Sequence, residues 1–178
     1  MKLLRTIRLD PSDTFVFERA AEPGEWAVSG AFVFSDMDPA TLQGKERSAF
    51  RGGFLGVTSL GWSTLVQIVD ASEEDRERLI GELAQRLVEK FGAPDFDAAR
   101  AAAEEEVHFT ASLCNQPQDT LIAVHRSFEN GEIREAFRSL HAKGGPKPLR
   151  AFSFLEVEDD EQPADQVDLV QLAHGERK

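Results

Sequence analysis

Alternation of apolar and polar residues predicts strands in several parts of the chain. Residues 3–9 alternate and indicate a first strand. Two β-rich runs in TFVFERAAEPGEWAVSGAFVF flank Pro23 and Gly24, which is a hairpin signature. Residues 54–60 and 63–70 continue the strand pattern, and the second run is apolar on both faces, as in a central strand. These runs predict an antiparallel sheet.

Phenylalanine recurs in pairs two residues apart. The pairs are Phe15/Phe17, Phe32/Phe34 and Phe152/Phe154. Residues two apart in a strand face the same side, so the pairs predict an aromatic layer on one face of the sheet. Residues 36–53 are polar and contain glycine, and we interpret them as a loop with one helical turn after Pro39.

A period of 3.6 residues predicts two consecutive helices. Ser72 and Asp75 have the spacing of a capping box, and Gly92 is the expected C-cap. The first apolar stripe is Leu79, Ile80, Leu83, Leu87, Val88 and Phe91. The second helix covers about residues 97–113, and its apolar face is expected to be Ala98, Ala102, Phe109 and Leu113.

The segment LIAVHRSFENGEIREAFRSL is compatible with two structures. Ile133, Ala136, Phe137 and Leu140 fit a helix stripe, whereas Asn130 followed by Gly131 is a strong hairpin turn signal. The turn pairs Phe128 with Ile133, Arg126 with Glu135 and Val124 with Phe137, on one shared face. Turn chemistry and hydrophobic pattern agree, so we favour the hairpin. Residues 149–157 form the last predicted strand.

These elements predict one α+β domain over residues 1–157. Its antiparallel sheet is built from hairpins, and the two consecutive helices pack on one face. Residues 158–178 are expected to form an acidic linker and a C-terminal tail. The apolar run at 167–173 has two interpretations, docking on its own domain or serving as a peptide for another protein.

Composition and charge narrow the classes of function. The 178 residues carry a net charge of −12, which argues against binding to nucleic acid or to anionic membrane surfaces. The chain has neither the apolar run of a signal peptide nor one long enough to span a membrane, so we expect a soluble, cytoplasmic protein. One cysteine cannot form an internal disulfide, and there is no tyrosine.

Two motifs in the string GVTSLGWS (residues 56–63) suggest chemistry that their context does not support. The glycine spacing is that of a phosphate-binding loop, but Trp62 occupies the lysine position and a strand follows instead of a helix. We therefore predict a hairpin turn at residues 60–63. Ser59 lacks the first glycine of a hydrolase nucleophile elbow, because Val57 occupies that position.

Two further candidates are incomplete. Glu105 and His108 have a di-metal spacing, but such sites need a second copy, so we expect a solvated helix face. Cys114 at a helix end is expected to be a small buried hydrophobe. The sequence thus contains no complete catalytic motif, no metal site and no cofactor motif. This favours a protein that is not an enzyme, although an active site assembled from scattered residues stays open.

Basic residues gather around the predicted hairpin. We call His125, Arg134, Arg138, Lys147 and Arg150 the basic patch. With Ser127, the first three lie on the outer face of the hairpin, and the last two follow the Gly-Gly-Pro stretch at 144–146. One interpretation is a solvated face that balances the acidic helices; the other is a site for an anion or an acidic partner.

The strings MKLLRTIRLD, RGGFLGVTSLGWSTLVQIVDAS and GGPKPLRAFSFLEVEDD resemble a family of small bacterial proteins of unknown function. The resemblance spans about residues 1–157. It implies no catalytic residues, and it favours an accessory role.

The leading hypothesis is therefore a cytoplasmic binding or accessory protein that contacts a protein partner through the basic patch and the tail. One alternative is an enzyme or small-ligand binder that recognises an anionic metabolite at the Arg134/Arg138 face. The other is a structural homo-oligomer.

Overall fold

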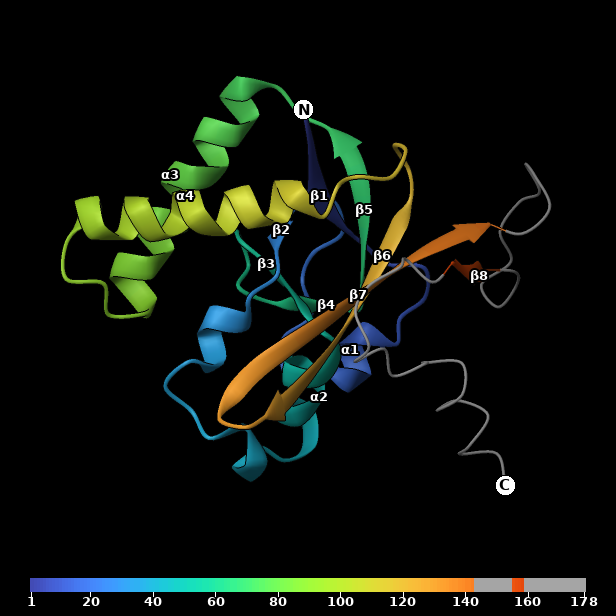
Figure 1. Cartoon of the computed structure of the whole chain (residues 1–178), viewed down its shortest axis with the longest axis horizontal. Helices are drawn as coiled ribbons and strands as arrows, with labels where there is room; N and C mark the ends of the chain where they lie inside the picture. The colour runs from blue at the N-terminus through green and yellow to red at the C-terminus, as the bar shows by residue number, and fades with distance from the viewer. Residues whose placement is uncertain (143–154, 159–178) are drawn as a thin grey trace.

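Eight antiparallel strands form one sheet, in the order β4-β3-β2-β1-β5-β6-β7-β8 (Figure 1). This computed structural model describes residues 1–142 and 155–158. The strands are β1 (Lys2–Ile7), β2 (Trp26–Val28), β3 (Phe54–Gly56), β4 (Trp62–Ser63), β5 (Leu65–Asp70), β6 (Leu121–Glu129), β7 (Glu132–Ala142) and β8 (Leu155–Glu158). The helices are α1 (Asp13–Val16), α2 (Gly44–Gly52), α3 (Glu73–Lys90) and α4 (Phe96–Ser112), with the 3-10 helices η1 (Ala31–Phe34) and η2 (Pro39–Thr41). The predicted α+β class and antiparallel sheet are confirmed.

The first strand, β1, lies inside the sheet and is covered on both faces. It pairs with β2 on one side and with β5 on the other. Leu3 and Leu4 point to opposite faces and are both fully buried, which explains why two leucines follow each other here. The predicted hairpin around Pro23 and Gly24 is wrong, because the run before this turn forms no strand and β2 pairs with β1.

Helices α3 and α4 share one hydrophobic cluster with the sheet. Leu79 and Leu83 of α3 and Ala103 of α4 pack with Leu3 and Val28 of the strands, all of them fully buried. Figure 1 shows α3 and α4 together on one side of the molecule and α1 and α2 together on another, and α2 contacts β6 of the β6–β7 hairpin. Helix α2 is therefore a neighbour of this hairpin.

The two long helices begin as predicted, but the buried face of α4 differs from the prediction. Ser72 and Asp75 form the capping box at the start of α3. The buried residues of α4 are Ala99, Ala103, Val107 and Thr110, whereas Ala98, Ala102 and Phe109 are exposed. An alanine-rich helix has no strong apolar stripe, so a face displaced by one residue fits the pattern equally well.

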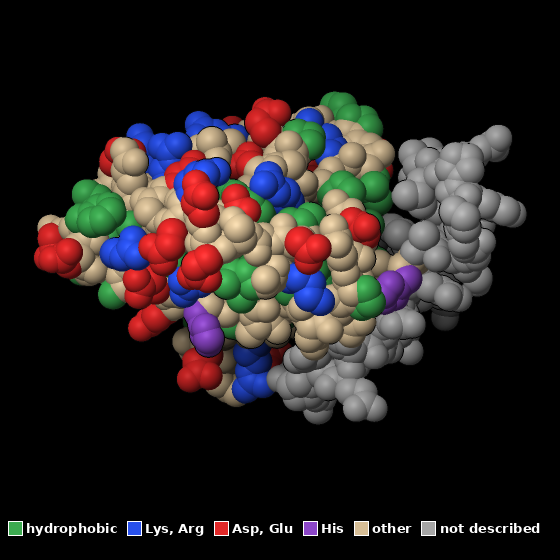
Figure 2. Space-filling view, turned by 90° about the horizontal axis from the view of Figure 1, so that it is seen from above, with side chains coloured by type: hydrophobic (Ala, Val, Ile, Leu, Met, Phe, Trp, Pro, Cys, Tyr) green, Lys and Arg blue, Asp and Glu red, His purple; other side chains and the backbone are tan. Residues whose placement is uncertain are grey.

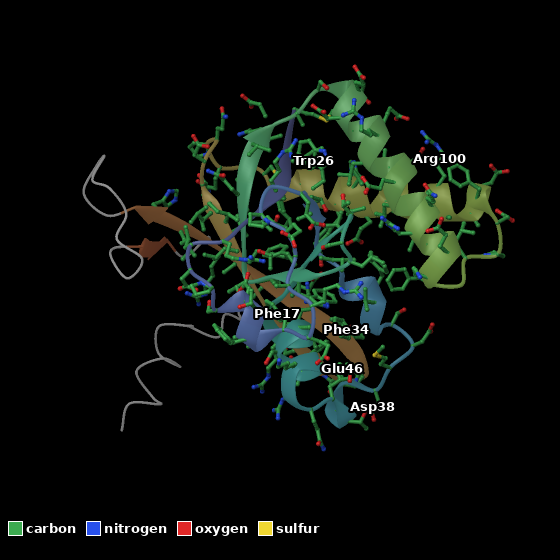
Figure 3. All side chains as sticks on the ribbon, turned by 180° about the vertical axis from the view of Figure 1, so that it is seen from behind. Phe17, Trp26, Phe34, Asp38, Glu46 and Arg100 are labelled. Atoms are coloured by element: carbon green, nitrogen blue, oxygen red, sulfur yellow. The ribbon has the colours of Figure 1, made fainter. Side chains whose placement is uncertain are left out.

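The N-terminal phenylalanine pairs do not form a strand layer, so that prediction is wrong. Phe15 lies in α1, and Phe32 and Phe34 lie in η1. Helical geometry turns each residue by about 100° from the last, which separates residues two apart. Phe15 is accordingly 71% exposed while Phe17 is buried. Phe17 and Phe34 point into a separate cluster beside α2 (Figure 3).

Residues 10–16 form a helical turn because polar side chains satisfy its backbone and anchor it. The Asp10 carboxylate accepts a hydrogen bond from the Ser12 N–H at 2.8 Å. Asp13 is 5% exposed, and its carboxylate accepts hydrogen bonds from the N–H and hydroxyl of Thr64, at 3.1 and 2.6 Å. These contacts tie α1 to the segment between β4 and β5.

The predicted loop over residues 36–53 contains helix α2, so that prediction is wrong for Gly44–Gly52. The expected turn after Pro39 is present as η2, and the Asp38 side chain caps it. Glycine at both ends concealed the helix, because glycine has a poor helix propensity. Burial of Ala49 and Phe50 against the core supplies the stability that propensity does not.

Strands β6 and β7 form the hairpin that the turn signal predicts, and the helix alternative at 133–140 is wrong. Asn130 and Gly131 have φ of 53° and 78°, as a type I′ turn requires. The register is the predicted one, Phe128 with Ile133, Arg126 with Glu135 and Val124 with Phe137.

The last predicted strand is present over Leu155–Glu158, where β8 pairs with β7. Residues 149–154, with Phe152 and Phe154, lie outside the described residues, as does the tail after Glu158. In the described part of the chain no helix is long and apolar enough to cross a membrane.

Charged side chains of both signs are interspersed over the helical side of the molecule (Figure 2). Arginines of α3 and α4 pair there with carboxylates of the same two helices: Arg76, Arg78, Arg86 and Arg100. Exposed pairs of this kind contribute little to stability. A buried ion pair, between Arg126 and Glu135, lies elsewhere, beside α2.

Candidate anion-binding pocket

The members of the predicted basic patch lie in different environments in the structure. His125 of β6 is half-buried, and Arg138 of β7 is only 4% exposed, so the expectation of a solvated face is wrong for Arg138. Arg134 lies near the hairpin tip, where its Nε is 3.4 Å from a carboxylate oxygen of Glu129. Two members lie outside the described residues, Lys147 and Arg150.

His125 lines a pocket of about 280 Å³ between α2 and β6. The pairing of β6 with β5 ends at Ala123, whereas β6 continues to Glu129 beside β7. Among the described elements, α2 therefore takes the place of a strand along this stretch of β6. The lining residues are Pro39, Ala40, Arg47, Phe50, Arg51, His125, Arg126, Ser127 and Phe128.

Two arginines of α2, Arg47 and Arg51, make the pocket cationic. They are four residues apart and so lie on the same face of the helix. Within residues 1–142 and 155–158 neither guanidinium forms a hydrogen bond or an ion pair, and no lining residue from these ranges carries a carboxylate. Like charges at this spacing destabilise a helix by about 0.2–0.5 kcal/mol. A bound anion would remove that repulsion.

The imidazole of His125 is held in its neutral form. Burial lowers the pKa of His125, and the positive charges of Arg51 on α2 and Arg138 on β7 lower it further. At neutral pH the side chain can therefore donate one hydrogen bond without adding a charge. The negative charge of an anion in the pocket would raise the pKa of His125 again.

Arg126 forms the floor of the pocket, and its donors are already used. It is 1% exposed; its Nε donates to Glu135 Oε2 at 2.9 Å, its Nη1 to the Phe50 carbonyl at 3.0 Å, and its Nη2 to the Ser29 carbonyl. The Phe50 carbonyl belongs to the last turn of α2, where carbonyls lack intrahelical partners, while the Ala49 carbonyl accepts both from Arg126 and from the Gly53 N–H. Arg126 thus fixes α2, with its two arginines, against β6.

A second carboxylate, Glu106 of α4, lies close to this buried ion pair. Its Oε1 accepts a hydrogen bond from the Gly30 N–H at 3.2 Å. Burial raises the pKa of Glu106, the Gly30 N–H lowers it, the charge of Glu135 raises it and that of Arg126 lowers it. Sequence reasoning missed Glu106 and selected its neighbours Glu105 and His108. These two are exposed on α4, as expected of a solvated helix face.

Residues 56–63 span the end of β3, a hairpin loop and β4, and form no phosphate-binding loop, as the missing lysine indicated. The turn lies at residues 57–61 rather than at 60–63, and Trp62 belongs to β4. The Glu25 carboxylate accepts a hydrogen bond from the Ser59 N–H at 2.9 Å. The Glu25 carboxylate therefore already accepts the hydrogen bond from a backbone N–H that a phosphate in this loop would need.

Cys114 is expected to resist alkylation in the folded protein. It is 5% exposed, and burial raises the pKa of its thiol to about 11, so the reactive thiolate is scarce at neutral pH. Iodoacetamide should modify the chain in urea but leave the native protein unmodified over the same time, as read by intact mass. Equal rates in both conditions would contradict the buried position.

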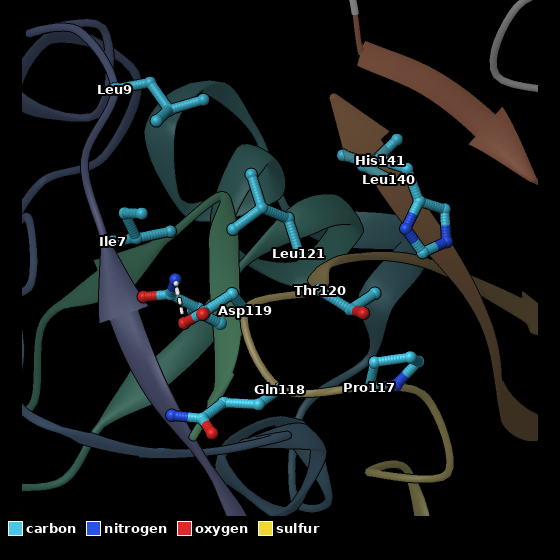
Figure 4. Close-up of a pocket in the computed structure, with 10 residues that line it drawn as sticks. Ile7, Leu9, Pro117, Gln118, Asp119, Thr120, Leu121, Leu140 and His141 are labelled. Atoms are coloured by element: carbon cyan, nitrogen blue, oxygen red, sulfur yellow. Dashed lines mark hydrogen bonds between the residues drawn. The ribbon is translucent and has the colours of Figure 1, made fainter. Parts of the chain in front are cut away.

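A second pocket, of about 340 Å³, lies between β1, β6 and β7 (Figure 4). Ile7, Leu121 and Leu140 contribute apolar surface, and Gln67 Nε2 donates to Asp119 Oδ1 at 3.1 Å. Among its described lining residues there is no lysine or arginine. This pocket therefore fits an anion less well than the pocket beside α2.

The fold and the pocket define a small α+β protein with a cationic cavity at the side of an antiparallel sheet. The chain matches the family of unknown function DUF6505 over residues 1–154 and belongs to that family. The resemblance to an uncharacterised family is thereby confirmed. No curated protein and no solved structure matches the chain.

Proposed function

We propose that this protein binds a small anion in the pocket between α2 and β6. The observation that carries the proposal is the pair Arg47 and Arg51, whose guanidinium groups have no partner within the described residues and flank a cavity with His125. Guanidinium groups bind carboxylates and phosphates through paired, charge-assisted hydrogen bonds. In this arrangement the arginines supply the charge and His125 supplies one neutral donor.

The proposal changes the residues of the anionic-ligand hypothesis. It keeps His125 and replaces Arg134 and Arg138 by the arginines of α2, because neither of the two lines the pocket and Arg134 lies beside Glu129. Partner binding through the basic patch and the tail stays a prediction, as does the homo-oligomer.

Inorganic phosphate is the first probe. At 100 times its Kd it should stabilise the protein by about 2.7 kcal/mol. For a chain of this size that corresponds to a rise in Tm of roughly 5–10 °C. The variant R47Q/R51Q should lose this rise, whereas R78Q, which removes an exposed arginine of α3, should retain it. Absence of any shift in the wild-type protein, or the same shift in R47Q/R51Q, would refute the proposed site.

Anion affinity is expected to increase several-fold as the pH falls. Because the folded-state pKa of His125 is lowered, the unfolded chain binds more protons below about pH 6.5, and stability declines as the pH falls through that window. An anion pairs with the imidazolium and opposes this loss, so binding and proton uptake are coupled. Sulfate keeps its charge over this range, and its Kd should be measured by titration calorimetry at several pH values.

Two variants test the origin of this pH dependence. H125Q should flatten the profile of the sulfate Kd, while H108Q, at an exposed position of α4, should leave it unchanged. A profile that H125Q does not alter would assign the dependence to another group.

A further inference from the structure

The walls of the pocket point to a specific class of ligand. We infer that it is an amphipathic organic anion, whose acid group contacts Arg47 and Arg51 and whose short apolar body packs on Phe50 and Phe128. This inference rests on the proposed function and adds the chemistry of the rest of the ligand.

The cationic groups come from α2, and the apolar groups come from α2 and β6, around one cavity. Arg47 and Arg51 are exposed residues of α2, whereas Phe50 of the same helix is 4% exposed and packs edge-on against Phe34 at 5.2 Å between ring centroids. Across the pocket, Phe128 of β6 is 41% exposed. An inorganic anion would leave this ring in water, while an alkyl or aryl group would cover it.

The volume limits the length of the apolar body. The cavity holds about 280 Å³, which corresponds to roughly nine water molecules at about 30 Å³ each. If each non-hydrogen atom of a ligand takes about the volume of one water molecule, a ligand of roughly nine or ten such atoms fills the space. A straight-chain acid of about eight carbons reaches this limit.

A series of straight-chain carboxylates from acetate to decanoate tests the inference by titration calorimetry. Affinity should rise roughly two- to fourfold per added methylene, the upper value being that for full burial, and should level off at about eight carbons. Butyl phosphate should likewise bind more tightly than inorganic phosphate, and its comparison with pentanoate, which carries the same butyl group, shows whether the acid group itself is selective.

Three variants separate the two walls. F128A should flatten the dependence on chain length and lower octanoate affinity about fivefold without changing acetate affinity, because it removes apolar surface alone. F96A, an exposed phenylalanine of α4 away from the pocket, should behave as the wild type. R47Q/R51Q should weaken every member of the series.

The outcomes distinguish this inference from the proposal on which it rests. Equal affinity for acetate and octanoate overturns the amphipathic ligand and leaves the anion site in place. A gain with chain length that F128A does not reduce places the apolar group elsewhere and overturns the inference. No binding of any carboxylate or phosphate removes both.

Discussion

Replacing Arg126 with methionine should lower the free energy of unfolding by about 3–5 kcal/mol, the cost of removing one member of a buried ion pair. The side chain of Arg126 is fully buried, and its Nε lies 2.9 Å from the Glu135 carboxylate. Methionine fills similar space but leaves the Glu135 carboxylate without its counter-charge, although the Ser29 hydroxyl still donates to it. The Ser29 and Phe50 carbonyls lose the Arg126 donor. Urea denaturation monitored by circular dichroism measures the loss.

A second substitution, at Glu135, shows how much of the lost stability comes from leaving that carboxylate charge unpaired. In R126M/E135Q the second substitution removes the buried negative charge, so the double variant should be more stable than R126M alone. R100M is the matched surface control. Arg100 pairs with Glu77 at 2.6 Å, but both side chains are well exposed, and the change should scarcely alter the unfolding midpoint. A loss in R126M no larger than that in R100M would refute a structural role for the buried pair.

Replacing Gly61 with alanine should destabilise the protein by about 3 kcal/mol, at the upper end of the usual cost of overpacking. A Cβ at this position would lie 2.6 Å from the carbonyl carbon and oxygen of Ala20 and from the nitrogen of Ala21. These backbone atoms cannot easily move, because the Ala21 N–H donates to the Trp62 carbonyl at 2.8 Å and the Trp62 N–H donates to the Arg19 carbonyl at 2.9 Å.

Gly81 of α3 offers the same substitution with the opposite expected sign. Apart from its chain neighbours and the backbone of its own helix, no heavy atom lies within 4 Å of a Cβ built at Gly81. G81A should therefore raise the free energy of unfolding by about 0.5–1 kcal/mol, the advantage of alanine over glycine within a helix. A urea midpoint of G61A at or above that of the wild type would contradict the close approach of the backbone at Gly61.

The candidate site was only partly accessible from the sequence. His125 was selected because turn chemistry at Asn130 placed it on a known face of the hairpin, and that register is confirmed. The spacing of four between Arg47 and Arg51 was a usable signal, but their segment was interpreted as a loop. The contact that brings these parts together joins Arg126 to Phe50, 76 positions apart, and no local pattern encodes it.

The sequence alone determined the elements whose stability is local. The β6–β7 hairpin follows from two residues that accept positive φ, and α3 follows from its capping box and apolar stripe. The tertiary structure decided the rest. Helices α1, η1 and α2 are too short to be stable by themselves and form because they bury side chains against distant residues. The same packing sets Arg47 and Arg51 beside His125, since Arg126 of β6 donates hydrogen bonds to the Ala49 and Phe50 carbonyls of α2.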